Sequence, residues 1–148
     1  MNDISTIDLW NLIIGSVSTL LSAVAIFLYI ILWMREKSDN NYEVFDSTYL
    51  EILKTGIEYP NFRNGEFTSD YKSHSNTEEI IRYEIYAFIC WNFCETLYDK
   101  GDEELMKTWS VVIDTENNLH RSWFNQPENA PKFKDEFRDF IFKKYPMI

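Results

Sequence analysis

The sequence is poor in the residues on which most catalytic and phosphate-binding motifs depend. It contains two histidines, two cysteines and four glycines in 148 residues. The glycines are isolated, so no glycine-rich phosphate loop is present, and no H-E-x-x-H, nucleophile-elbow or kinase signature occurs. We therefore predict no enzyme, no catalytic residues, no cofactor and no metal site.

The two cysteines have little chemistry to support. Cys90 and Cys94 are one helical turn apart, and neither has a second Cys or His pair at zinc-ligand spacing. A reducing compartment would keep both as thiols. We predict two buried apolar thiols.

Basic residues are scarce and unevenly placed. The chain has 14 Lys and Arg against 24 Asp and Glu, a net charge of −10. This balance argues against binding of double-stranded nucleic acid, which requires neutralisation of phosphates, and against docking on anionic lipid. It leaves room for a small anionic ligand in one local basic pocket.

One long stretch, from Leu9 to Met34, has no charged residue at all. A helix needs roughly 20 apolar residues to cross a bilayer core. Trp10 and Trp33 are spaced roughly 34 Å apart at about 1.5 Å per residue, which suits the two headgroup layers. A signal peptide is the main alternative, but the N-terminal flank is acidic and the apolar run is too long. We predict a transmembrane helix within residues 1–34.

The orientation follows from the basic residues, which all come after this stretch, beginning with Arg35 and Lys37. The positive-inside rule then places residues 35–148 in the cytoplasm and the N-terminus outside. We expect a single-pass protein of a bacterial inner membrane.

A row of small or polar residues follows one side of the predicted span, at heptad spacing. The row consists of Asn11, Gly15, Ser18, Ser22 and Ala25. Helices associate in lipid through such residues, so the row predicts a homo-oligomer, and a pore is a further alternative. The other interpretation is that the hydroxyls bond back to carbonyls of their own helix.

Residues 35–148 carry enough aromatic residues to fold as one domain. Apolar periodicity predicts a mainly α fold of about four helices: residues 42–57, a second that ends at Asp99 or Lys100, a third at 102–124 and a closing helix that begins near Pro131. The second helix would start at a capping box in Ser75-Asn76-Thr77-Glu78-Glu79, in either register, and have Gly101 as its C-cap. A polar joint, 35–41, allows the first of these to run on from the span or to bend. Ile81, Ile85 and Phe88 give the second helix an additional apolar face, so we expect it to be central.

An irregular loop is expected at 59–76, with a short hairpin or packed aromatics beneath it. It holds Arg63, Lys72 and His74 among aromatic residues, which would form a local anion site. The alternative is a solvated connector.

One polar constellation stands out on the two central helices: Glu95, Glu116, His120 and Arg121, beside Trp91, Trp109 and Trp123. A Glu–His dyad can act as a general base. As structure, the group would be a buried network in which Glu95 pairs with Arg121 or His120. Ligand binding is the third alternative.

At these residues a resemblance appears. It is carried by Trp91-Asn92-Phe93 with Glu95, Thr108-Trp109, Leu119-His120-Arg121, Trp123-Phe124 and the Phe-rich closing helix. Together they resemble small bacterial single-pass membrane proteins with a helical cytoplasmic domain. The layout is also similar to membrane effectors of type III CRISPR systems, which bind cyclic tetra-adenylate in antiviral defence. That similarity implies stacking of adenines on aromatics, pairing of phosphates with Arg or Lys, and a tetramer.

The resulting hypothesis is a membrane-anchored sensor and effector that binds a small ligand, such as a cyclic oligoadenylate, and perturbs an oligomeric membrane helix. The alternative is a passive adaptor that tethers a protein partner at the membrane. The candidate ligand-binding residues are Arg63, Lys72, His74, Trp91, Asn92, His120, Arg121 and Trp123.

Overall fold

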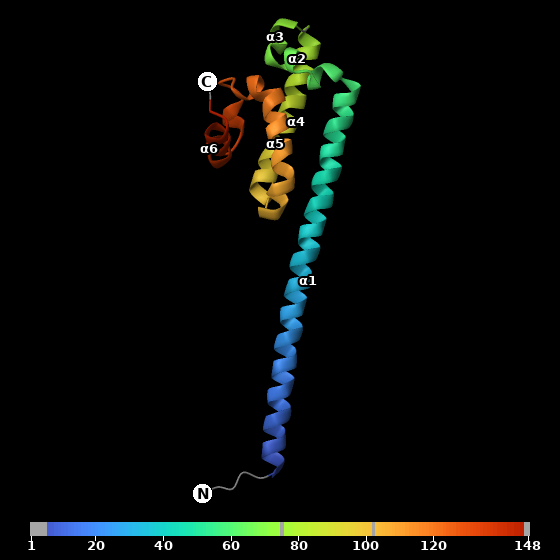
Figure 1. Cartoon of the computed structure of the whole chain (residues 1–148), viewed down its shortest axis with the longest axis vertical. Helices are drawn as coiled ribbons and strands as arrows, with labels where there is room; N and C mark the ends of the chain where they lie inside the picture. The colour runs from blue at the N-terminus through green and yellow to red at the C-terminus, as the bar shows by residue number, and fades with distance from the viewer. Residues whose placement is uncertain (1–5, 75, 102, 147–148) are drawn as a thin grey trace. The chain divides into compact units, whose positions relative to one another are not determined.

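The computed structural model describes residues 6–74, 76–101 and 103–146, without the side chains of 6–9, 12, 35–41 and 74. The described residues form helices and no strand (Figure 1). The helices are α1 (Thr6–Glu58), η1 (Pro60–Arg63), α2 (Gly65–Ser69), α3 (Tyr71–His74), α4 (Thr77–Lys100), α5 (Glu103–Phe124), η2 (Ala130–Lys132) and α6 (Asp135–Lys144). Their residues divide into two compact units, Met1–Glu43 and Val44–Ile148.

The first unit contains the apolar part of α1. Ile13–Met34 has a mean hydropathy of 2.3 and is long and apolar enough to cross a membrane, and the protein itself buries none of it. Within it, the Thr19 hydroxyl donates to the Gly15 carbonyl at 2.8 Å and the Ser22 hydroxyl to the Ser18 carbonyl at 2.9 Å. These hydroxyls therefore bond back to their own helix, as one of the two interpretations predicted. Self-association through Gly15 and its neighbours stays a prediction.

The second unit has more helices than the four expected. Residues 59–76, predicted to be irregular, contain η1, α2 and α3. Local signals explain the difference: Pro60 occupies the first turn of η1, and the Asn64 side chain accepts the Glu66 N–H at the start of α2. The described part of this segment, 59–74, contains no hairpin.

Aromatic side chains pack beneath these short helices, as the second expectation for this segment proposed. Phe62, Phe67 and Tyr71 are buried, and the rings of Tyr71 and Tyr83 approach to 4.6 Å between centroids. This burial fixes the 59–74 segment against α4, because each of its three short helices contributes one ring to the core.

The two central helices are close to their predicted bounds. The Asn76 side chain caps α4 by accepting the Glu79 N–H at 2.9 Å, and Gly101 follows the last turn, as predicted. Figure 1 shows α4 and α5 side by side and antiparallel. The closing helix begins later than expected: Pro131 belongs to η2, and α6 starts at Asp135.

The surroundings of α4 differ between its faces. Its buried residues are Tyr83, Tyr86, Ala87, Cys90, Trp91, Phe93, Cys94 and Leu97. Both thiols are buried, as predicted. The second apolar face was expected to make the helix central on most sides, but Ile81, Ile85 and the neighbouring Ile89 are exposed. Phe88 on the same face is covered only in part, by Trp123 and Phe133.

Candidate functional site

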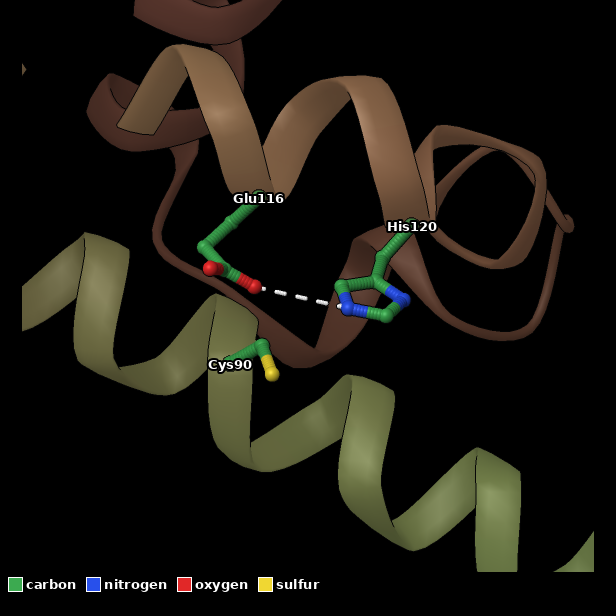
Figure 2. A group of neighbouring side chains, drawn as sticks. All are labelled: Cys90, Glu116 and His120. Atoms are coloured by element: carbon green, nitrogen blue, oxygen red, sulfur yellow. Dashed lines mark ion pairs between the residues drawn. The ribbon is translucent and has the colours of Figure 1, made fainter. Parts of the chain in front are cut away.

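A buried polar cluster lies between α4 and α5. Glu116 and His120 are one turn apart on α5 and face Cys90 on α4 (Figure 2). All three side chains are fully buried, and the ligand-type atoms they offer lie within 4.8 Å of one another. The spacing of four residues on one helix explains why the two α5 side chains point the same way.

Glu116 is the centre of this cluster. One guanidinium nitrogen of Arg63 lies 2.7 Å from Oε1 and 2.8 Å from Oε2, and the Tyr49 hydroxyl donates to Oε1 at 2.9 Å. Burial alone would raise the pKa of Glu116, but His120 and the Arg63 charge outweigh it and lower the pKa to about 2. The carboxylate is therefore ionised and closely paired. Burial, together with the charge and hydrogen bond of Glu116, raises the pKa of Tyr49 to about 12, although Arg63 opposes the shift.

His120 is held on several sides. Its Nδ1 lies 3.1 Å from the Tyr83 hydroxyl, and its backbone carbonyl accepts the Trp91 indole N–H at 3.1 Å. Its Nε2 lies 3.4 Å from Glu116 Oε2, which is ion-pair distance without hydrogen-bond geometry. Burial lowers the pKa of His120 below its ordinary value, although the Glu116 charge opposes this, so the ring is neutral near pH 7.

A glycine makes room for the arginine. A Cβ at Gly56 of α1 would lie 2.7 Å from Cγ of Arg63 and 2.9 Å from the Tyr86 hydroxyl oxygen. Side chains larger than hydrogen at this position would therefore push the arginine stem away from its path to Glu116. No pattern in the sequence indicates this packing role of Gly56.

Cysteine, glutamate and histidine are ligands that zinc accepts, so Cys90, Glu116 and His120 form a candidate metal site by residue type. Both Glu116 oxygens already accept from the Arg63 cation. Burial also raises the pKa of the Cys90 thiol well above its ordinary value, so the sulfur is protonated. The guanidinium thus already uses the carboxylate oxygens that a metal would need, and the cluster is an ion pair of Arg63 and Glu116 with neutral neighbours.

The predicted pairing within the constellation is wrong. Glu95 accepts the Lys134 backbone N–H at 2.7 Å and pairs with neither His120 nor Arg121. Arg121 donates to the Tyr145 carbonyl at 2.9 Å and to the Asn117 side chain at 3.2 Å. The partner of Glu116 comes from the 59–76 segment, which sequence spacing does not connect to α5.

The residues proposed for an anion site do not converge. Arg63 is directed at Glu116, whereas the Lys72 ammonium lies 3.6 Å from Glu128. The side chain of His74 lies outside the described residues. Trp91 and Trp123 are buried, while Asn92 is exposed beyond the cluster. The structure therefore spreads the seven candidate ligand-binding residues whose side chains it describes over several surroundings.

Several contributors to the cluster escaped the sequence analysis: Tyr49, Gly56, Tyr83 and Cys90 as a neighbour of Glu116. The Glu116–His120 spacing was a visible signal. The others come from two helices, α1 and α4, and no local pattern indicates that they meet the α5 residues.

The second candidate functional feature is an exposed apolar surface on α4. Ile81, Ile85, Phe88 and Ile89, here called the α4 outer face, keep 52%, 57%, 38% and 46% of their area exposed. Single exposed apolar residues are ordinary, but four along one helix stripe mark an interaction surface. The sequence placed three of these residues on one face and expected that face to be covered.

Comparison with known proteins identifies no relative. No family model, curated protein or solved structure matches this chain. The resemblance to small bacterial membrane proteins and type III CRISPR effectors stays a prediction, and functional proposals rest on the described residues.

Proposed function

We propose that this chain is a single-pass membrane protein that acts by protein–protein contact, with the α4 outer face as its docking surface. The anchor is the apolar part of α1, Ile13–Met34, and the docking domain is the unit that begins at Val44. The observation that carries the proposal is the exposed apolar stripe on α4.

The burial and pairing of Glu116 and His120 favour a function in protein–protein contact over a function in catalysis. Glu116 and His120 are fully buried, and the carboxylate is already held by Arg63 and Tyr49. A general base must reach its substrate within hydrogen-bond distance, directly or through one water, and these atoms face other protein atoms instead. The stripe on α4, in contrast, is accessible along its length, although the ring of Phe88 also contacts Trp123 and Phe133.

The sensor and effector hypothesis is a more specific form of this proposal. It adds a small ligand, such as a cyclic oligoadenylate, and a response of the membrane helix. The dispersal of Arg63, Lys72, Asn92 and Arg121 favours the contact function without that ligand.

The anchor and its orientation are tested first. Full-length chain in bacterial membranes should resist extraction at alkaline pH, and protease should cut the C-terminal unit in inverted vesicles but not in right-side-out ones. Release by alkali contradicts the anchor, and the reverse protease pattern contradicts the orientation.

The docking surface is tested by measuring whether a partner shields it from a thiol reagent. Ile85→Cys and Val111→Cys place a thiol at sites of similar exposure, 57% and 63%, on α4 and α5. The native thiols are buried and serve as a silent background. In inverted vesicles, Ile85→Cys should react with a maleimide about tenfold more slowly than Val111→Cys, because a bound partner shields it. A tenfold difference corresponds to a binding free energy of about 1.4 kcal/mol in favour of the shielded state. In dilute detergent, the two cysteines should react at similar rates. Equal rates in the vesicles would refute the docking function.

A further inference from the structure

The α4 outer face has the form of a ridge. Ile81, Ile85, Phe88 and Ile89 follow the spacing of positions i, i+4, i+7 and i+8, so their side chains lie along one line of the helix. Asn92, also exposed, continues the same line one heptad after Ile85. The ridge is thus apolar for two turns and then ends in an amide.

Two grooves flank this ridge, and both include Ile85 in their walls. One, of about 340 Å³, reaches Trp123 and Lys132. The other, of about 290 Å³, reaches Tyr59 and Arg82. Helices pack by placing the ridges of one into the grooves of the other. A surface that carries both a ridge and its grooves is complementary to a copy of itself, which is what a two-fold interface requires.

The charged residues that border the ridge are also compatible with a second copy of the chain as the partner. Arg82 and Lys132 are cationic, whereas Glu78 and Glu84 are anionic, and all four border the ridge or its grooves. Arg82 and Glu78 form an exposed pair within one chain, which a second copy can extend. An anionic lipid surface would meet the two carboxylates and a chain of net charge −10. Two copies, in contrast, can each present a cation to an anion of the other.

Asn92 adds a further argument. A single asparagine in an otherwise apolar helix seam pairs with the same residue of a parallel partner, since its amide can both donate and accept. It lies on the line of the ridge at the position where a parallel copy brings its own Asn92. The ridge therefore contains a register-setting residue as well as an apolar centre.

We propose that the α4 outer face is a homotypic interface, and that its occupant is the α4 outer face of a second copy of this chain. The inference rests on the proposed docking function, because a shared membrane raises the effective concentration of anchored copies. Ile85 lies at its centre and Asn92 at its end.

The test uses the full chain in vesicles, with Ile85→Cys, Asn92→Cys and, as control, Val111→Cys. Oxygen with copper phenanthroline removes two electrons and two protons from a pair of thiols and forms one disulfide. We expect a product of twice the chain mass from Ile85→Cys and Asn92→Cys, at least about tenfold more abundant than from Val111→Cys and absent from the native chain. Adding Phe88→Glu should reduce it to the control level.

The outcomes separate the two proposals. No excess dimer from either α4 position overturns the homotypic interface. If Ile85→Cys is nevertheless protected from maleimide, the docking function stands and the occupant is a different protein. If it is neither cross-linked nor protected, both proposals fail.

Discussion

The two faces of α4 consist of similar apolar residues but have opposite surroundings. One face, which includes Cys90, Trp91 and Leu97, is fully buried, whereas the α4 outer face is open. The difference lies in the polar atoms. On the buried side, the Tyr83 hydroxyl meets His120, and the Tyr86 hydroxyl donates to the Ile52 carbonyl at 3.2 Å. Buried polar groups need partners, so these contacts specify which face turns inward.

The apolar part of α1 extends this comparison. Ile13–Met34 exposes apolar side chains around its circumference, whereas α4 exposes them along one stripe. A helix that is apolar on all sides and uncovered suits lipid as its solvent. A one-sided stripe suits a protein surface, because the rest of the helix already has its neighbours.

The largest expected difference concerns two arginine pairs: Arg63 with Glu116, which faces the buried side of α4, and Arg82 with Glu78 on the exposed surface of α4. Arg63→Leu should lower the free energy of unfolding by about 3–5 kcal/mol, because it leaves the buried Glu116 charge uncompensated. Arg82→Leu, which breaks the exposed pair with Glu78, should cost at most about 1 kcal/mol. Urea unfolding in detergent, followed by tryptophan fluorescence, measures both. Similar losses would mean that the buried pair carries no special cost.

Truncations on the same helix sharpen the comparison further. Leu97→Ala removes a fully buried side chain and should cost about 2–5 kcal/mol. Ile85→Ala on the α4 outer face should change the stability of the dilute chain by no more than about 0.5 kcal/mol. The same unfolding experiment compares them, and a large loss from Ile85→Ala under dilution would show that this face is already packed within one chain.

Lowering the pH should reduce the free energy of unfolding by removing the charge of the buried Glu116. The pKa of Glu116 falls from 4.5 to about 2 in the folded chain, so its contribution of about 3 kcal/mol is present above pH 4.5 and lost as the pH falls toward 2. His120, whose pKa is also lowered, acts in the same direction below its ordinary value of 6.5. Unfolding measured between pH 7 and pH 2 should show this loss, and Glu116→Gln should flatten it. A native chain with a flat profile would contradict the buried pair.

The smallest expected effect concerns Gly56, which leaves space for the side chain of Arg63. Gly56→Ala should cost about 1–3 kcal/mol, since its Cβ meets Arg63 and Tyr86. Gly65→Ala is the matched control: nothing lies within 4 Å of its Cβ, so stability should be unchanged or slightly higher. Thermal unfolding of both variants decides the matter, and a neutral Gly56→Ala would show that the arginine can take another path.

The sequence predicts much of the local structure. The uncharged stretch before Arg35 predicted the candidate span, and Asn76 and Gly101 predicted the ends of α4. These features depend on residues close together in the chain. The short helices of 59–74 were missed because their start signals are weak against a polar background: η1 depends on one proline and α2 on one asparagine.

The site was harder to predict than the helices. The spacing of Glu116 and His120 places both on one side of α5, but nothing local indicates that Arg63 supplies the countercharge. Likewise, periodicity identified an apolar stripe at Ile81 and Ile85 without indicating whether the chain covers it. Both questions depend on which distant segments meet, and single-sequence patterns carry no information about such meetings.

The separation along the chain between Glu116 and its partners has a consequence during synthesis. Arg63 precedes Glu116 by 53 positions and Tyr49 precedes it by 67. At about 5–20 residues per second, the ribosome delivers the carboxylate roughly 3–10 s after the guanidinium. The predicted anchor is made earlier still, so the nascent chain would sit at the membrane with an incomplete core. The last third of the protein then determines when this domain stops being a substrate for chaperones and proteases.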